Sequence, residues 1–208
     1  MQLAHTLEIS LPGVFSSQAE QDDAQHVKAS QHGDQDAFAF LMQKHQRFVF
    51  NMVLRMLQDY DDAGEVTQEA FLAAWQGLPS FRGEARFATW LYRIAYHCCL
   101  RQLERRKRER NLQAVIEAEQ ILEGMRKEKQ VEDFLEQRDR QVMVREQMEQ
   151  LPSQYRMVLI LRHLQEMTYE EMAAVLSMPV GTIKTHLFRA RNLLKERLLA
   201  QHLCVSES

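Results

Sequence analysis

Apolar residues recur at intervals of three and four along most of the chain, the spacing of one face of an α-helix. The repeat begins near Asp36 and is interrupted by an acidic stretch at residues 59–62. It resumes over residues 63–77, where it predicts a second helix with Asp61 or Asp62 as the N-cap. Leu and Pro follow this segment and end it.

A third helix is expected from about Phe87, amphipathic at first and strongly basic later. We assign residues 35–108 to one small domain and residues 109–146, which are dense in charge, to a linker that permits some helix. Residues 1–34 are polar and are interpreted as a flexible N-terminal extension. Gly and Pro are sparse, with 7 and 4 among 208 residues. The predicted fold class is therefore all-α, with two small helical domains joined by a charged linker.

Residues 147–200 carry the pattern of a helix-turn-helix, followed by a tail at 201–208. Thr168 and Glu171 have the spacing of a capping box, and Pro179 can start the next helix after a break. One side of that next helix is apolar, and the other can offer donors to base edges and phosphates. The polar side and its flank carry Thr182, Lys184, Thr185, His186, Phe188 and Arg189. The alternative is an ordinary helical hairpin with a solvated basic face.

Aromatic and basic residues are interleaved between residues 81 and 97. Single-stranded nucleic acid is bound by such sets, because bases stack on rings while cations hold phosphates. The alternative is that the rings belong to a core, and we expect at least Trp90 or Leu91 to be buried.

The net charge of −3 does not indicate nucleic-acid binding, but the charge distribution does. Basic residues concentrate at 101–110 and 184–197, and acidic residues at 22–36 and 59–69. Separate patches of opposite sign suggest at least two partners of opposite character. Ordinary solvated faces are the alternative.

Several classes of protein are disfavoured by the sequence. The three cysteines, Cys98, Cys99 and Cys204, have neither disulfide-framework nor CxxC spacing, so we expect no metal site. A Gly-rich phosphate loop and a nucleophile motif are both missing, so we expect no catalytic residue, no cofactor and no enzyme activity. A secretory signal and a bilayer-length apolar run are also missing, which predicts a cytoplasmic protein without membrane insertion.

Two segments together resemble a known family. DAGEVTQEAFLAAWQGLPSFRGEARFATWLYRIAYH resembles region 2 of sigma-70 factors, and LPSQYRMVLILRHLQEMTYEEMAAVLSMPVGTIKTHLFRARNLLKERL resembles region 4. Their order, with only a linker between them, is similar to the extracytoplasmic-function (ECF) subfamily. The resemblance covers about residues 35–108 and 147–199. It implies a sigma factor that binds core RNA polymerase and directs promoter-specific transcription initiation.

The resemblance also implies partners and site residues. Core RNA polymerase would be contacted through its β′ clamp and β subunits, promoter DNA at two elements, and an anti-sigma factor would hold the protein inactive. The implied polymerase-binding residues are Asp62, Glu65, Val66, Gln68, Glu69 and Phe71. The residues implied to recognise and melt the −10 element are Phe81, Arg82, Arg86, Thr89, Trp90, Tyr92, Arg93 and His97. The polar side and flank of the second helix of the helix-turn-helix would bind the −35 element through Thr182, Lys184, Thr185, His186, Phe188 and Arg189. Gly64 and His97 depart from the family pattern, which usually has an acidic residue and an Asn there.

Two other functions remain open at this stage. A DNA-binding regulator would recognise an operator as a dimer, but residues 36–108 lack the signature of a ligand pocket that a sensing domain would need. A purely structural helical protein is the other alternative, and promoter-specific transcription would exclude it.

Overall fold

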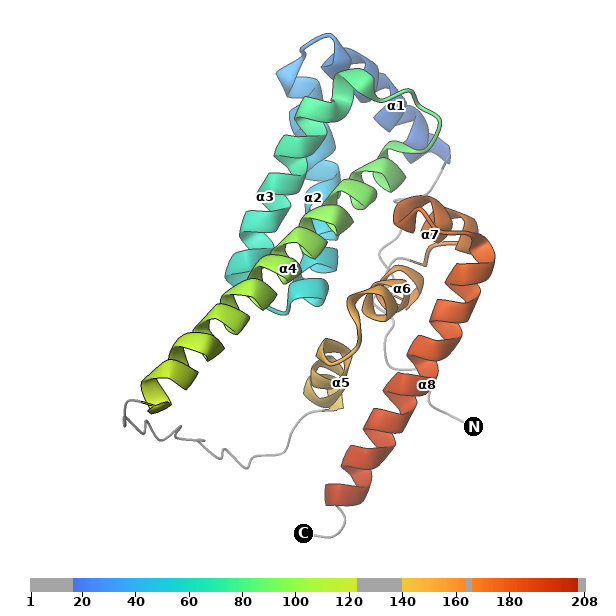
Figure 1. The fold of residues 1–208 in the computed structure, drawn as a ribbon. Coiled ribbons are helices and arrows are strands. Elements are labelled where there is room, and N and C mark those ends of the chain that lie inside the picture. Colours follow the sequence, from blue (N-terminus) through green and yellow to red (C-terminus); the bar gives the residue numbers. More distant parts are fainter. Residues whose placement is uncertain (1–16, 123–139, 164–165, 206–208) are drawn as a thin grey trace.

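The computed structural model describes residues 17–122, 140–163 and 166–205, and within these ranges the regular elements are helical, which confirms the all-α prediction. Figure 1 shows two groups of helices lying side by side, here called the N-terminal unit and the C-terminal unit. The N-terminal unit consists of α1 (Ser17–Gln31), α2 (Gln35–Leu57), α3 (Tyr60–Gly77), the short 3-10 helix η1 (Leu78–Ser80) and α4 (Phe87–Leu122). The C-terminal unit consists of α5 (Arg140–Glu149), α6 (Ser153–His163), α7 (Tyr169–Leu176) and α8 (Val180–Val205).

The core of the N-terminal unit lies between α2, α3 and α4, which pack against one another. Leu41 and Met52 of α2, Ala70 of α3 and Leu91 of α4 are fully buried. Leu91 therefore meets the expectation that it or Trp90 is buried, whereas Trp90 is half-buried at the edge of this core. Small alanines on α3 let the three helices approach closely, and the burial of apolar area stabilises the unit.

The flexible extension expected over residues 1–34 is wrong for residues 17–31, which form α1. Val27 is buried, and Asp23 bonds to Lys44 at 2.7 Å and to the buried His45 at 2.9 Å. Burial by itself raises the pKa of Asp23, but the bonds from His45 and Lys44 outweigh it and hold this pKa below its ordinary value of 3.8. A paired carboxylate, rather than an apolar stripe, thus fixes α1 to α2.

Helix α3 begins three residues earlier than predicted. Its N-cap is Asp59, whose carboxylate accepts a hydrogen bond at 2.9 Å from the backbone N–H of Asp62. The expected caps, Asp61 and Asp62, lie inside the first turn, where acidic side chains are favourable next to the positive helix end. All three aspartates satisfy the local rules for a cap, so the sequence pattern could not separate them.

Helix α4 is longer than the expected domain. It runs on from Phe87 to Leu122, past residue 108, so the first part of the segment expected to be a linker continues the helix. The end of that segment joins α5. The stretch between them, residues 123–139, lies outside the described residues.

The C-terminal unit contains the predicted helix-turn-helix. The capping box is present: Glu171 donates its backbone N–H to the Thr168 hydroxyl at 3.2 Å, and its carboxylate accepts from the Thr168 N–H at 2.8 Å. Helix α7 ends at Leu176, its C-cap Ser177 has a left-handed φ of 53°, and α8 follows Pro179. The core of the unit is formed by α6, α7 and α8 and includes Met157, Ile160, Leu161, Met172, Ile183 and Leu187.

The two units are in contact along two seams, α4 with α7 and α2 with α6 (Figure 1). Their buried residues form one continuous hydrophobic cluster. Within the described ranges, the helices are too short or too polar to cross a membrane.

Candidate functional site

The start of α8 presents a polar stripe to solvent on the side away from the core. Ile183, Leu187 and Ala190 are buried and hold the helix on α6 and α7. The residues spaced three and four apart on the other side are exposed: Gly181, Lys184, Thr185, Phe188, Arg189 and Asn192. Phe188 keeps 67% of its surface exposed, which is unusual for an aromatic residue on a basic helix. The stripe combines two cations, a hydroxyl and a ring, a set suited to the major groove of duplex DNA.

Two members of the predicted −35 set lie at the margin of this stripe. Thr182 and His186 are only half-exposed. The His186 ring meets Tyr155 of α6 edge-on, with ring centroids 5.3 Å apart. The stripe itself therefore consists of Lys184, Thr185, Phe188 and Arg189, and His186 is held against the domain.

The aromatic residues of the first half gather around the turn between η1 and α4. Phe81 is half-buried, with ring centroids 4.9 Å from Trp90 and 6.3 Å from Phe87. The Trp90 ring lies so close to Gly77 that a β-carbon there would meet it at 3.3 Å. The Trp90 ring thus supports the turn by packing beneath it. This packing explains the position of Trp90 without any contact to DNA.

Residues 82–86 form the exposed rim of this turn. Arg82 is exposed, and Gly83 has a φ of +74°, a conformation that residues with a β-carbon rarely adopt. The side chain of Gln31 on α1 donates hydrogen bonds to the carbonyls of Leu78 at 3.0 Å and Phe81 at 2.8 Å. Helix α1 therefore braces the turn, a role that sequence reasoning missed because backbone acceptors leave no trace in the sequence.

The other predicted −10 residues divide between surface and core. His97 is exposed, and Arg86 and Arg93 point toward α7, with which both make polar contacts. Thr89 and Tyr92 are buried, and their side chains are not available to DNA in this conformation. Burial raises the pKa of Tyr92 well above its ordinary value, so its hydroxyl stays protonated.

The predicted polymerase-binding residues lie on α3, and they too are divided between the surface and the core. Glu65, Gln68 and Glu69 are exposed. Val66 and Phe71 are buried in the core and can shape the face only from beneath. The exposed face continues to Leu72, an apolar side chain that is 58% exposed.

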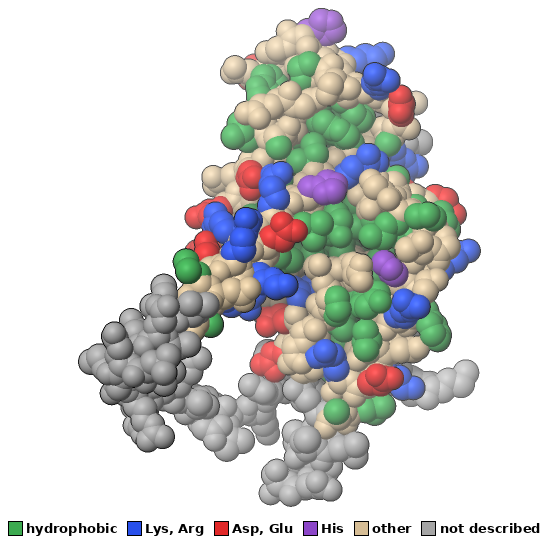
Figure 2. Space-filling view, viewed as in Figure 1, with side chains coloured by type: hydrophobic (Ala, Val, Ile, Leu, Met, Phe, Trp, Pro, Cys, Tyr) green, Lys and Arg blue, Asp and Glu red, His purple; other side chains and the backbone are tan. Residues whose placement is uncertain are grey.

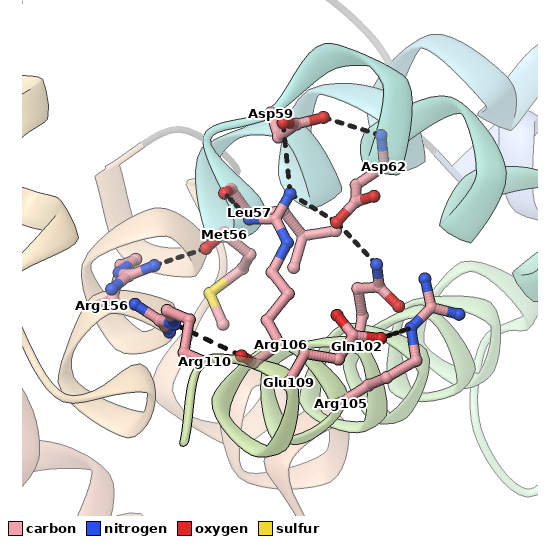
Figure 3. Close-up of polar contacts among 10 residues, drawn as sticks. All are labelled: Met56, Leu57, Asp59, Asp62, Gln102, Arg105, Arg106, Glu109, Arg110 and Arg156. Atoms are coloured by element: carbon pink, nitrogen blue, oxygen red, sulfur yellow. Dashed lines mark hydrogen bonds and ion pairs between the residues drawn. The ribbon is translucent and has the colours of Figure 1, made fainter. Parts of the chain in front are cut away.

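Two acidic residues of α3 pair with the basic part of α4. Arg106 reaches the carboxylates of Asp59 and Asp62 and donates to the Leu57 carbonyl at 2.9 Å, while Gln102 also bonds to Asp62 (Figure 3). Farther along, Arg101 contacts Glu69 at 2.6 Å. In Figure 2, acidic and basic side chains accordingly lie next to one another over α3 and α4. Some of the acidic and basic residues whose separation in the sequence suggested two external partners therefore pair with each other within the protein.

The cysteines described have no sign of metal chemistry. Cys98 and Cys99 are buried, and burial raises the pKa of both thiols, so they stay protonated. Among the residues described, no group of three His, Cys, Asp or Glu side chains could hold a metal ion. The side chain of Cys204 lies outside the part described.

Comparison with known proteins matches both units. The model of the family "Sigma-70 region 2" matches residues 41–109, and that of "Sigma-70, region 4" matches residues 141–194. The RNA polymerase sigma-H factor of Pseudomonas aeruginosa is 33% identical over 183 residues, which cover 86% of this chain and 95% of that protein. The ECF RNA polymerase sigma-E factor of Escherichia coli (strain K12) is 36% identical over 177 residues, 83% of this chain and 92% of the relative.

Solved structures share the fold. CnrH in complex with the cytosolic domain of CnrY matches with a TM-score of 0.61 at 25% identity, over 86% of this chain and 98% of that one. The sigma factor RpoE of Bartonella quintana, in complex with the anti-sigma factor NepR, matches with a TM-score of 0.58 at 23% identity, over 77% and 96%. With two family models in the right order and relatives matched over almost their whole length, the chain belongs to the sigma-70 family, as an ECF RNA polymerase sigma factor.

Proposed function

We propose that this sigma factor binds core RNA polymerase through the exposed face of α3, promoter −10 DNA through residues 81–97, and −35 DNA through α8. The observation that carries the proposal is the α8 stripe, because exposed cations and an exposed ring lie directly opposite a fully buried apolar stripe. A recognition helix needs such a division, which ordinary amphipathic helices share, and the exposed ring of Phe188 sets α8 apart from a merely solvated helix. In domain terms, residues 35–108 serve polymerase binding and −10 recognition, with α1 as an added brace, and residues 147–200 serve −35 recognition.

Replacing Arg189 with alanine should weaken and relax −35 recognition. A base-edge contact contributes about 1–3 kcal/mol of discrimination, and loss of a phosphate contact lowers the salt dependence of binding. Arg191→Ala is the matched control, since Arg191 is also exposed on α8 but lies 3.4 Å from His163 on α6, away from the stripe. Fluorescence anisotropy with −35 duplexes over a range of salt concentrations measures both. Equal affinity and salt slope for the parent and Arg189→Ala would exclude this assignment.

The double change Glu65→Arg and Gln68→Ala should weaken binding to core polymerase. Both residues are exposed on α3, and an acidic, amide-bearing face suits a basic partner, whose approach it accelerates. Glu69 is less suitable, because its ion pair with Arg101 would also be lost. Asp22→Arg, which makes the same charge change on exposed α1, is the control. Titration of labelled sigma with core polymerase gives the affinity, and unchanged affinity with unchanged helicity would contradict the proposal.

We also infer that an anti-sigma factor covers the α3 face and keeps the protein from polymerase. Two structural relatives were solved with a bound partner protein, the anti-sigma factor NepR in one and the cytosolic domain of CnrY in the other. The Glu65→Arg and Gln68→Ala protein should then recover less of this partner than the parent does in affinity capture from uninduced cells. Capture of core polymerase alone by the parent protein would count against the inference.

A further inference from the structure

Gln31 is the last residue of α1, and its side chain reaches the segment that enters the turn at residues 82–86. Its amide nitrogen donates hydrogen bonds to the carbonyl oxygens of Leu78 and Phe81, at 3.0 and 2.8 Å. Both partners are acceptors, so the nitrogen of the amide, and not its oxygen, must face them. One side chain thus joins α1 to backbone positions 47 and 50 residues farther along the sequence.

These hydrogen bonds hold the backbone of Phe81 from two sides. Its N–H donates to the Leu78 carbonyl at 3.0 Å, and its own carbonyl accepts from Gln31. Because the peptide bond is planar, the orientation of the Phe81 carbonyl also sets that of the Arg82 N–H in the same plane. The direction in which the exposed Arg82 side chain leaves the turn therefore depends on a donor supplied by α1.

The end of α1 is itself fixed by the start of α2. Gly33, which has a left-handed φ of +93°, donates to the carbonyl of Ser30 at 3.0 Å. The carboxylate of Asp34 then caps α2 by accepting from its first turn. Gln31 lies immediately before this tight connection, so α2 determines where its side chain stands relative to the turn.

The attachment of α1 to the protein has a separate origin. Asp23 bonds to Lys44 and to the buried His45, and Val27 is buried in the core. These contacts lie one to two helical turns before Gln31 and hold α1 on α2. The hydrogen bonds of Gln31 are thus not needed to dock the helix, and what they add is a fixed backbone at the entry to the turn.

We propose that Gln31 is a positioning residue for promoter opening, which holds Phe81 and Arg82 in the orientation in which the turn binds an unpaired base of the −10 strand. The proposal rests on the proposed function of residues 81–97. A site that is already oriented loses less conformational freedom when it binds. Without the donors of Gln31 the turn should bind the strand more slowly, while the α8 stripe and the exposed α3 face stay unchanged.

Two changes at Gln31 separate hydrogen bonding from packing. Gln31→Met keeps the length of the side chain and removes both donors, whereas Gln31→Lys supplies N–H donors again. Gln35→Met and Gln35→Lys are the matched controls, because Gln35 is exposed at the start of α2 and undergoes the same two changes. With holoenzyme on a cognate duplex promoter, the time course of permanganate reactivity at unpaired thymines gives the rate of opening. Core-polymerase titration and −35 duplex anisotropy are measured on the same proteins.

Gln31→Met should open the promoter about two- to tenfold more slowly than the parent, the effect of about one net hydrogen bond. Its affinities for core polymerase and −35 duplex should not change, Gln31→Lys should recover most of the rate, and both Gln35 variants should match the parent. A parallel loss of all three activities, or slowing that Gln31→Lys did not relieve, would overturn the proposal. So would an unchanged rate for Gln31→Met while Arg82→Ala slowed opening. If Arg82→Ala also opened the promoter normally, the strand-binding role of the turn would fail with it.

Discussion

Replacing Arg156 with methionine should lower the free energy of unfolding by about 3–5 kcal/mol, the range for removing one partner from a buried charged network. Arg156 is buried and donates to four backbone carbonyls, of Met56, Met148, Glu149 and Leu151. Burial lowers the pKa of Arg156, because taking the cation out of water is costly, and the four acceptors offset that cost. Methionine fills the space but leaves these carbonyls without their donor.

Arg162→Met is the control for this change. Arg162 also lies on α6, but it is half-exposed and donates to one carbonyl, that of Met167, at 2.8 Å. Its replacement should cost about 1.5–3 kcal/mol, the value for one hydrogen bond to a charged group. Urea titrations followed by far-ultraviolet circular dichroism compare the two variants. If both variants lost the same free energy of unfolding, Arg156 would not hold the two units together as its contacts indicate.

Replacing Arg82 with alanine should leave closed promoter complexes intact but slow strand opening by about 10- to 150-fold. Extruding a base costs a few kcal/mol of stacking. A hydrogen bond from a cation to a phosphate returns about 1.5–3 kcal/mol, a range that corresponds to this change in rate. Arg82 is a sharper probe than Phe81, because the Phe81 ring also packs on Trp90 and Phe87. Loss of the Phe81 ring would loosen the turn as well as the DNA contact.

The measurement for Arg82 is the permanganate reactivity of unpaired thymines on a cognate promoter with holoenzyme. Glu84→Ala is the control, since Glu84 lies on the same exposed turn and carries the opposite charge. It should open the promoter at least as well as the parent. A template with a preformed bubble should restore transcription by Arg82→Ala. Normal thymine reactivity on duplex promoter would instead assign melting to another element.

The helix-turn-helix could be predicted from sequence because each of its signals is local. Thr168 and Glu171 lie three residues apart, and the apolar stripe of α8 repeats every three or four. The N-terminal helix α1 could not be predicted in this way, because Val27 is its one buried apolar side chain among the described residues and its other buried side chains are polar. Asp23 can be buried only next to Lys44 and His45, and that pairing across more than twenty residues has no local signature.

The bonds that three arginines make to helix ends could not be predicted, for a related reason. Arg93, Arg106 and Arg156 all bond to backbone carbonyls at helix ends. A carbonyl belongs to every residue, so its use as an acceptor depends on where the helix ends and not on which residue is there. Sequence reasoning assigned Arg93 to promoter DNA and identified Arg106 only as part of a basic run, so it gave to external partners some of the charge that the fold uses itself.

Because α4 is continuous, it limits where residues can be inserted into the chain or deleted from it. Trp90, which supports the turn at residues 82–86, and Arg106, which caps α2, lie on one uninterrupted helix. Each inserted residue would rotate everything beyond it by about 100° and shift it by about 1.5 Å. One insertion between them would therefore turn Arg106 away from the end of α2 while leaving the aromatic turn in place. The exposed turn at residues 82–86 has no such helical phase to keep, so gains and losses of residues there should leave the packing of α4 on α2 intact, whereas those in the middle of α4 should disrupt it.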